Sequence, residues 1–209
     1  MKQLLVLLFL CPLLALSQNS IEQELDSIST TDEAKSFAKA HKKINQSKVF
    51  IFNKEKHKTK LANELFKLSV GGKKVVKKED KKTYYKVIDK EKKTHHRVSY
   101  IFFDGRKLTA EEINSKRQKI IKQYKQGYKF EALARLHSMD PIAKKGGDLG
   151  WFPEGRMHPD FENAVISHSK DDIFTIDIAD RQWHYIVLKT HEAQAIEEIT
   201  VLKYSEVVK

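Results

Sequence analysis

Histidine and acidic side chains are the groups in this sequence that could bind a metal ion or move a proton, but their spacing predicts neither a metal site nor a nucleotide site. His95 and His96 are adjacent, so in a strand their side chains would point to opposite faces. The sequence contains no His-Glu-x-x-His spacing, no glycine loop of the phosphate-binding kind and no nucleophile elbow. We therefore expect no metal ion and no cofactor.

Five short blocks in the second half of the chain combine turn residues with apolar residues. The blocks are FEALA at 130–134, DP at 140–141, KGGDLGWF at 145–152, GRM at 155–157 and FENA at 161–164. Asp140 precedes a proline, which is typical of a turn. In the apolar strand expected at 183–189, alternation places His184 on the same face as Ile186, as expected of a core histidine.

In this order and at this spacing, the five blocks resemble the parvulin (rotamase) family of peptidyl-prolyl cis/trans isomerases, over residues 95–190. The resemblance implies an α+β fold in which helices wrap a four-stranded antiparallel sheet, with a shallow groove for a proline of an unfolded or extended polypeptide. Rotation about the X-Pro bond must pass a barrier of roughly 20 kcal/mol set by amide resonance. An apolar pocket, a few hydrogen-bonding groups and exclusion of water are sufficient to favour the twisted amide.

The resemblance also implies roles for individual side chains. Leu149, Met157 and Phe161 match the residues that line the prolyl pocket of the family. Asp140 matches the polar group beside the rotating amide, and His184 matches the histidine that orders the hydrogen-bond network there. Judged from the residues alone, Asp140 could instead do no more than open a turn.

Tyr100 is the chief departure from the family pattern, because parvulins usually place the first of two hydrogen-bonded histidines there. A phenol donates and accepts a hydrogen bond, but it does not change charge near neutral pH. Two functions are therefore expected as alternatives. One is a prolyl isomerase, weakened by Tyr100, that assists the folding of exported proteins. The other is a non-catalytic chaperone or peptide-binding module on the parvulin fold.

The elements expected to hold these residues alternate between strands and helices, as in an α+β domain. Alternation predicts a strand at 97–103, with Tyr100 on the face of Val98 and Phe102. The run Thr109-Ala-Glu-Glu112 is a capping box, so a helix should begin there. Further helices are expected at 130–136 and 159–165, and strands at 173–178 and 183–189.

The first residues have the layout of a secretory signal peptide, which we expect to span 1–17. Its apolar run is shorter than the ~20 residues of a membrane-spanning helix. Cys11, the only cysteine, lies inside it. We therefore expect a protein that is exported to the periplasm or secreted, without a transmembrane segment in the mature chain.

Residues 18–94 are expected to form a smaller α/β region before the domain, and residues 191–209 a C-terminal tail. Shifted by one hundred residues, the segment 60–89 resembles the second half of the parvulin-like domain, with Leu61 at the position of Phe161 and Tyr85 at that of Tyr185. One interpretation is a degenerate copy of half a parvulin domain, which would be non-catalytic because the glycine turn and the pocket residues have no counterpart there. Chance similarity of helix, turn and strand is the alternative.

The formal net charge of +11 is unevenly distributed, since ten lysines lie between Lys73 and Lys93. Such a segment could contact an anionic surface, or it could be a solvated and soluble face. A nucleic-acid partner is not expected, because the lysines lack interleaved arginine and stacking aromatic residues. The expected partners are proline-containing unfolded or extended polypeptides.

Overall fold

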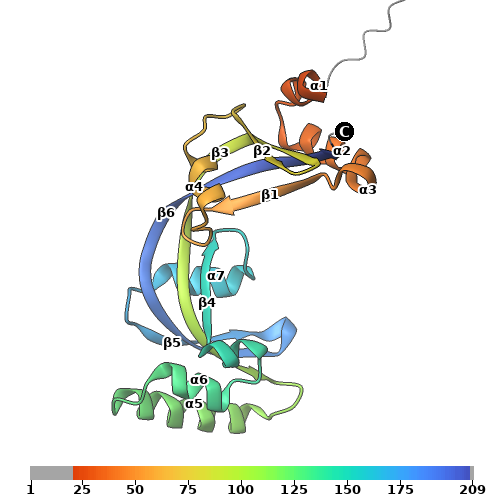
Figure 1. Ribbon diagram of the computed structural model, residues 1–209. Coiled ribbons are helices and arrows are strands. Elements are labelled where there is room, and N and C mark those ends of the chain that lie inside the picture. The colour runs from red at the N-terminus through yellow and green to blue at the C-terminus, as the bar shows by residue number, and fades with distance from the viewer. Residues whose placement is uncertain (1–20, 208–209) are drawn as a thin grey trace, which may run out of the picture.

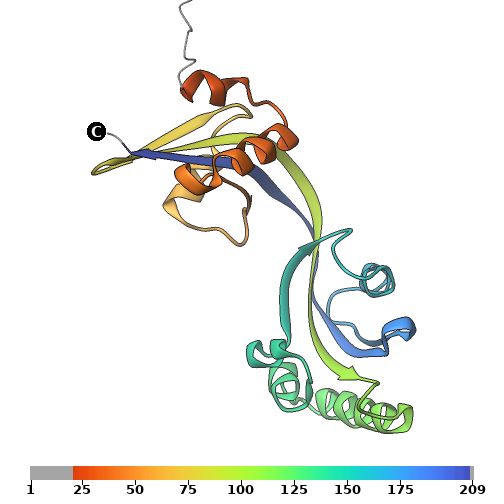
Figure 2. The ribbon, with the colours of Figure 1, turned by 90° about the vertical axis from the view of Figure 1, so that its right-hand side faces the viewer.

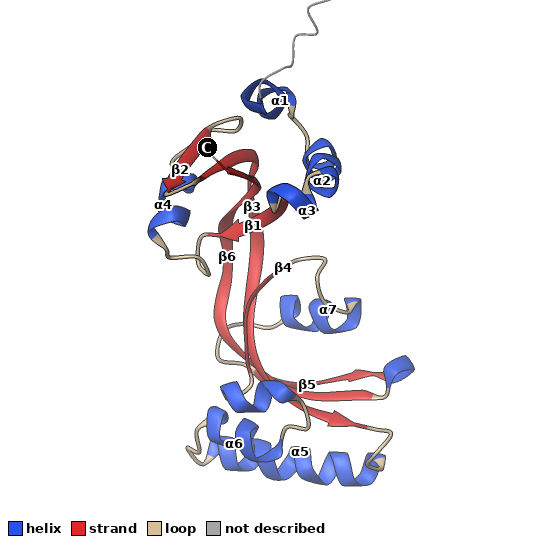
Figure 3. Cartoon of the chain, turned by 45° about the vertical axis from the view of Figure 1, so that its right-hand side comes forward, coloured by secondary structure: helices blue, strands red, loops and turns tan. Residues whose placement is uncertain are grey.

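Two long strands, β3 (Lys81–Asp104) and β6 (Trp183–Val207), pair antiparallel along almost their whole length. Figure 1 shows them joining an N-terminal lobe to a C-terminal lobe, and in Figure 3 the same strands enter the sheet of both lobes. The computed structural model describes residues 21–207. Because β3 and β6 are shared, the lobes are built on one continuous six-stranded sheet.

The other elements divide between the lobes, which Figure 2 shows at opposite ends of the β3–β6 pair. The N-terminal lobe contains α1 (Ile21–Ser27), α2 (Thr31–Ala40), α3 (Lys42–Asn45), β1 (Lys48–Asn53), α4 (Lys60–Phe66) and β2 (Lys73–Lys78). The C-terminal lobe contains α5 (Ala110–Lys125), α6 (Phe130–His137), the 3-10 helix η1 (Pro141–Lys145), β4 (Asp148–Pro153), α7 (Pro159–Ser167), β5 (Ile173–Ile178) and the 3-10 helix η2 (Ala179–Arg181).

The C-terminal lobe has four antiparallel strands in the order β4-β3-β6-β5, which confirms the predicted α+β class and four-stranded sheet. Buried residues of α7, such as Phe161 and Val165, pack on one face with Val98 and Val187. Helices α5 and α6 cover the other face, where Ile101 is fully buried. The sheet therefore has two buried faces, and the site described below lies on the α7 face.

Local sequence signals fix where α5 begins. The Thr109 hydroxyl accepts a hydrogen bond from the Glu112 main-chain N–H at 3.3 Å, and Glu112 Oε2 accepts one from the Thr109 N–H at 2.8 Å. This is the predicted capping box, which satisfies amide groups that have no partner inside the helix.

The N-terminal lobe has strands in the order β1-β6-β3-β2, so its sheet includes the last part of the chain. We predicted a tail at 191–209, but residues 191–207 belong to β6 and pair with β1 and β3. That prediction is wrong because the partners of this segment are far away in the sequence, and they bury apolar side chains such as Ile199 and Val201.

The predicted signal peptide at 1–17 lies outside the described residues. Among residues 21–207, none of the helices combines the length and apolar character needed to cross a bilayer.

The two lobes repeat one order of elements at a spacing of one hundred residues. The order α4, β2, β3 matches α7, β5, β6, and β2 and β5 have bounds one hundred residues apart. A lysine from the long strand caps the C-terminal end of each helix: Lys90 Nζ donates to Phe66 O, and Lys189 Nζ donates to Val165 O. Descent of the N-terminal lobe from a copy of the domain stays a prediction, to which this likeness adds support.

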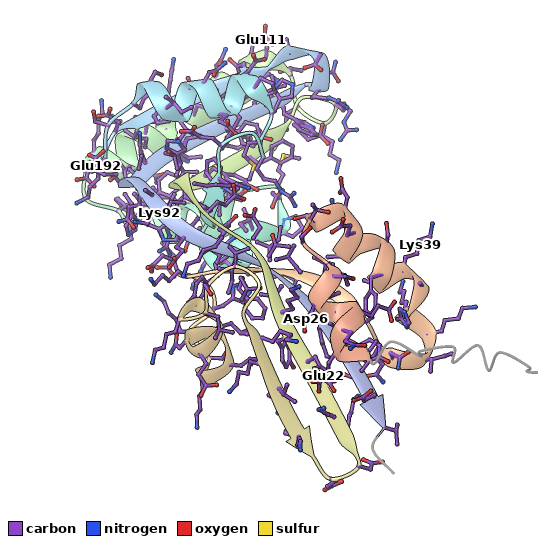
Figure 4. The ribbon with its side chains drawn as sticks, turned by 90° about the horizontal axis from the view of Figure 1, so that it is seen from above. Glu22, Asp26, Lys39, Lys92, Glu111 and Glu192 are labelled. Atoms are coloured by element: carbon purple, nitrogen blue, oxygen red, sulfur yellow. The ribbon has the colours of Figure 1, made fainter. Side chains whose placement is uncertain are left out.

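The lysine-rich segment 73–93 forms the β2–β3 hairpin, and five of its ten lysines lie in ion pairs. Lys73 Nζ lies 2.6 Å from Oδ1 of Asp26, and Lys82 Nζ lies 2.7 Å from Oε1 of Glu22. Figure 4 labels these two acidic residues of α1 beside the hairpin. Ion pairs also form at Lys74, Lys90 and Lys93. Lys77, Lys78 and Lys92 are exposed and have no ion pair within residues 21–207, so the anionic surface contact stays a prediction.

Lys86 ties α1 to the sheet, and its replacement should destabilise the fold. It is only 4% exposed, burial lowers its pKa, and its Nζ donates to the carbonyl oxygens of Leu25, Asp26 and Ile28 at 2.7, 3.0 and 2.6 Å. Lys86→Met leaves these acceptors without their donor, so we expect the free energy of unfolding to fall by about 1–3 kcal/mol in urea titration. The control is Lys77→Met, an exposed lysine of the same hairpin. Equal effects of the two substitutions would show that Lys86 has no such role.

Candidate active site

An apolar pocket of about 120 Å³ lies on the α7 face of the C-terminal lobe. It contains the predicted prolyl-pocket residues Leu149, Met157 and Phe161 and places Tyr100 beside them. The remaining lining residues are His158, Ile178, Trp183 and Tyr185. The structure thus gathers, around one pocket, side chains from four strands (β3, β4, β5 and β6), from α7 and from the loop before it.

Aromatic rings of Tyr100, Phe161 and Tyr185 pack edge to face around this pocket. The centroid of Tyr185 lies 5.4 Å from that of Tyr100 and 5.3 Å from that of Phe161. Strand register explains the arrangement: Tyr100 is paired with Val187 and Phe102 with Tyr185, and residues directly opposite in a sheet share a face. The β3–β6 pairing therefore brings the two tyrosines together.

Asp140 is held near these tyrosines by bonds from its own segment to β3. The Met139 N–H donates to Phe102 O at 2.9 Å, and the Phe102 N–H donates to the Ser138 hydroxyl at 3.0 Å. Asp140 itself caps η1, since its Oδ1 accepts from the Ile142 N–H at 2.7 Å. The turn predicted from the Asp-Pro pair is therefore present, and it sets the carboxylate beside the pocket.

The glycine turn after η1 brings the chain back against β3. The Tyr100 N–H donates to Gly147 O at 3.0 Å. Gly147 has a φ of +80°, and a Cβ there would lie 2.4 Å from Tyr100 O, which no ordinary side chain tolerates. This position must be glycine for the segment from Asp140 to Leu149 to line the site.

The pKa values of both tyrosines are raised. For Tyr100 the causes are burial, followed by the charge of Asp140, the neighbouring Tyr185 and a hydrogen bond with Asp140. Burial, followed by the charge of Asp140, raises the pKa of Tyr185 to about 12. Both phenols are therefore neutral hydrogen-bond donors at physiological pH, directed at a region that Asp140 also faces.

The start of α7 positions Met157. The carboxylate of Glu162 accepts hydrogen bonds from the main-chain N–H groups of Gly155 at 2.7 Å and Met157 at 3.3 Å. Pro159 occupies the first turn of α7, where its missing N–H has no cost. The block GRM at 155–157 is thus fixed to the helix that carries Phe161.

His184 does not lie where the resemblance implied. It pairs with Phe103 on the α5 side of the sheet, and its Nδ1 lies 2.6 Å from Oδ1 of Asp177. The prediction that it orders a network with Tyr100 and Asp140 is wrong in its geometry, because the alternation of β6 turns it to the opposite face. Its neighbour Tyr185 occupies the place that we assigned to it.

Sequence reasoning missed Tyr185 and Trp183 as site residues. The same alternation that grouped His184 with Ile186 also groups Trp183, Tyr185 and Val187, so the signal was present. What the sequence lacked was the register, which pairs Tyr100 with Val187 and so identifies the face that matters.

The histidine pair is divided as predicted between two environments. His95 Nε2 lies 3.1 Å from Oε1 of Glu198 and 3.1 Å from Nδ2 of Asn53. His96 Nε2 instead lies 3.1 Å from Oε1 of Glu154. Within residues 21–207 no group of three or more His, Cys, Asp or Glu side chains is arranged to hold a metal ion.

Comparison with known proteins adds sequence relatives for the same part of the chain. The foldase protein PrsA of Bacillus subtilis (strain 168) is 34% identical over 113 residues, which are 54% of this chain and 36% of PrsA. The chaperone SurA of Thiobacillus denitrificans is 34% identical over 107 residues, 50% of this chain and 24% of SurA. The chain thus matches only about a quarter to a third of the length of these relatives.

Solved structures match the same half of the chain. The crystal structure of PrsA from Bacillus subtilis is 32% identical with a TM-score of 0.38, covering 47% of this chain and 35% of that chain. The solution structure of the parvulin domain of PpiD from E. coli is 23% identical with a TM-score of 0.40, covering 50% of this chain and 92% of that chain.

The family described as PPIC-type PPIASE domain matches residues 82–192, which is more than half of the chain. The match begins within the N-terminal part of β3, before the boundary at 95 that we predicted, and ends in β6. It includes the pocket, Asp140 and both tyrosines. The chain therefore belongs to the PPIC-type PPIASE domain family, the parvulin family that its sequence blocks resemble.

Proposed function

We propose that this chain is a peptidyl-prolyl cis/trans isomerase that acts on proline-containing segments of unfolded or extended polypeptides. The observation that carries the proposal is the pocket of Leu149, Met157 and Phe161, bordered by Asp140 and the phenols of Tyr100 and Tyr185. The names of its relatives, a foldase and a chaperone, agree with a role in protein folding. Export is part of the proposal and is supported by the leader-like residues 1–17.

The proposed reaction needs no proton transfer and no covalent intermediate. The apolar pocket holds the proline ring, while the amide before it rotates through a state in which the nitrogen has lost conjugation with the carbonyl. The hydroxyl of Tyr185 supplies a donor, whereas that of Tyr100 donates to the carboxylate of Asp140 and offers its oxygen as an acceptor. Such groups accelerate rotation only to the extent that they bind the twisted amide more tightly than the planar one.

A second candidate function is a chaperone or peptide-binding module without isomerase activity. The observation that favours it is that the two rings in contact beside the pocket are both tyrosines, although parvulins usually have a histidine at the position of Tyr100. The two functions differ in whether a bound proline peptide exchanges its isomers faster. Binding alone does not distinguish them, because the pocket serves both.

Truncation in the pocket should weaken the binding of proline peptides. Met157 is half-buried at the pocket, so Met157→Ala removes apolar contact with the ligand, and we expect a loss of about 1–2 kcal/mol in isothermal titration. The matched control is Ile166→Ala, which removes a 47% exposed apolar side chain near the C-terminal end of α7. Binding that is unchanged by Met157→Ala would place the peptide elsewhere.

Removing the charge of Asp140 should lower the isomerisation rate more than it lowers affinity. Asp140→Asn retains an oxygen that can cap η1 but no longer orients the phenols, so we expect kcat to fall by about tenfold or more in a protease-coupled assay. The control is Asp160→Asn, an exposed carboxylate at the start of α7. Equal rates for wild type and Asp140→Asn, both above the uncatalysed rate, would remove Asp140 from the mechanism.

The rate should not respond to tyrosine ionisation at moderately alkaline pH. With the pKa of Tyr185 at about 12 and that of Tyr100 also raised, both phenols keep their protons. We therefore expect kcat/KM to be constant between about pH 8 and 10, a range in which histidines are already neutral. A loss of activity near pH 9 that disappears in Tyr185→Phe would contradict the neutral-donor role.

A further inference from the structure

A cavity of about 570 Å³ lies in the N-terminal lobe, far along the chain from the prolyl pocket. Helices α2 and α3 form one side of it and the start of β1 forms the other. Its lining residues are Lys35, Ala38, Lys39, Lys42, Gln46, Ser47, Lys48 and Val49, so four lysines surround an apolar floor and no acidic side chain contributes.

Helical spacing places the lysines of this cavity in one stripe. Lys35, Lys39 and Lys42 are separated by four and three residues, which sets them on the same side of α2 and its continuation. Among the described residues, only Lys35 has an acidic partner, the exposed Asp32 on its own helix. Figure 4 labels Lys39 on α2. Lys39 and Lys42 therefore carry positive charge that no ion pair offsets within the described residues.

The free edge of β1 borders the same cavity. Among residues 21–207, β1 pairs with β6 alone, so it is the outer strand of the N-terminal sheet. The Lys54 N–H donates to Glu197 O, so Lys54 is in a hydrogen-bonded pair with β6. Bonded and non-bonded pairs alternate along an antiparallel ladder. Val49 and Ile51 are therefore in non-bonded pairs, and their main-chain N–H and C=O groups point away from β6. Ile51 is also 60% exposed. An apolar edge with outward-facing donors and acceptors can accept a further strand.

We infer that this edge and cavity form a second polypeptide-binding site, which takes an extended, acidic segment of another protein as an added strand beside β1. The edge supplies main-chain hydrogen bonds, Val49 and Ile51 supply apolar contact, and the lysine stripe selects carboxylates. A second copy of this chain is a poor occupant, because its own β1 would bring Lys48 toward these lysines. The site does not depend on isomerase activity in the other lobe.

The test uses the full chain and a fluorescent peptide of alternating glutamate and valine, which contains no proline and so does not require the prolyl pocket. Lys39→Glu with Lys42→Glu reverses the stripe. Lys116→Glu with Lys119→Glu is the matched control, since these are exposed lysines of α5 at the same spacing and the net charge changes equally. Fluorescence anisotropy at physiological salt measures each affinity.

We expect the stripe variant to bind the acidic peptide about tenfold more weakly and the α5 variant to bind it like wild type. Ile51→Pro removes an outward N–H without breaking the ladder to β6, and should also weaken binding, whereas Ile51→Val keeps both the N–H and an apolar side chain and should not. Circular dichroism confirms that each variant is folded.

Equal weakening by the two charge reversals, or an affinity that Ile51→Pro leaves unchanged, would overturn the proposal. It would also be overturned if the acidic peptide does not bind while vesicles of phosphatidylglycerol bind through the lysine stripe. That result would make the stripe a membrane contact.

Discussion

The antiparallel pairing of β3 with β6 is the constraint on which the rest of the structure depends. Its register runs from Lys81 opposite Val207 to Asp104 opposite Trp183, so one pair of strands supplies the centre of both four-stranded arrangements. The same register decides which side chains share a face. Because a slip by one residue would turn every side chain to the opposite face, the pocket exists only in this register.

The site follows from that constraint with few additional bonds. The register places Tyr100 and Tyr185 on the α7 face, and contacts of Ser138, Met139 and Gly147 with β3 bring Asp140 to them. The result is an apolar pocket with two neutral donors and one carboxylate. This combination fits a reaction that is limited by amide resonance, since it offers selective hydrogen bonding and no proton relay.

The sequence predicted those parts of the fold and the site that depend on local signals. The helix beginning after Thr109 and the turn at Asp140 both follow from residues close together in the chain, whereas the close approach of Gly147 to Tyr100 was not predicted. That Leu149, Met157 and Phe161 lie around one pocket could also be predicted, because the blocks that contain them keep the family's spacing. The errors concern long-range pairing. Residues 191–207 pair with β1 and with the first part of β3, which lie far away in the sequence, and His184 was given a role in the site without the register that shows which face of β6 the site uses.

The central claim is that this pocket catalyses rotation about the peptide bond before a proline and does not only bind the proline-containing peptide. Nuclear magnetic resonance exchange spectroscopy of one proline peptide, with a substoichiometric amount of the full chain, measures that rotation directly. The account predicts cross-peaks between the cis and trans signals that grow with protein concentration and are lost in Asp140→Asn. Shifts or broadening that show binding, without any exchange between the isomers, would contradict it.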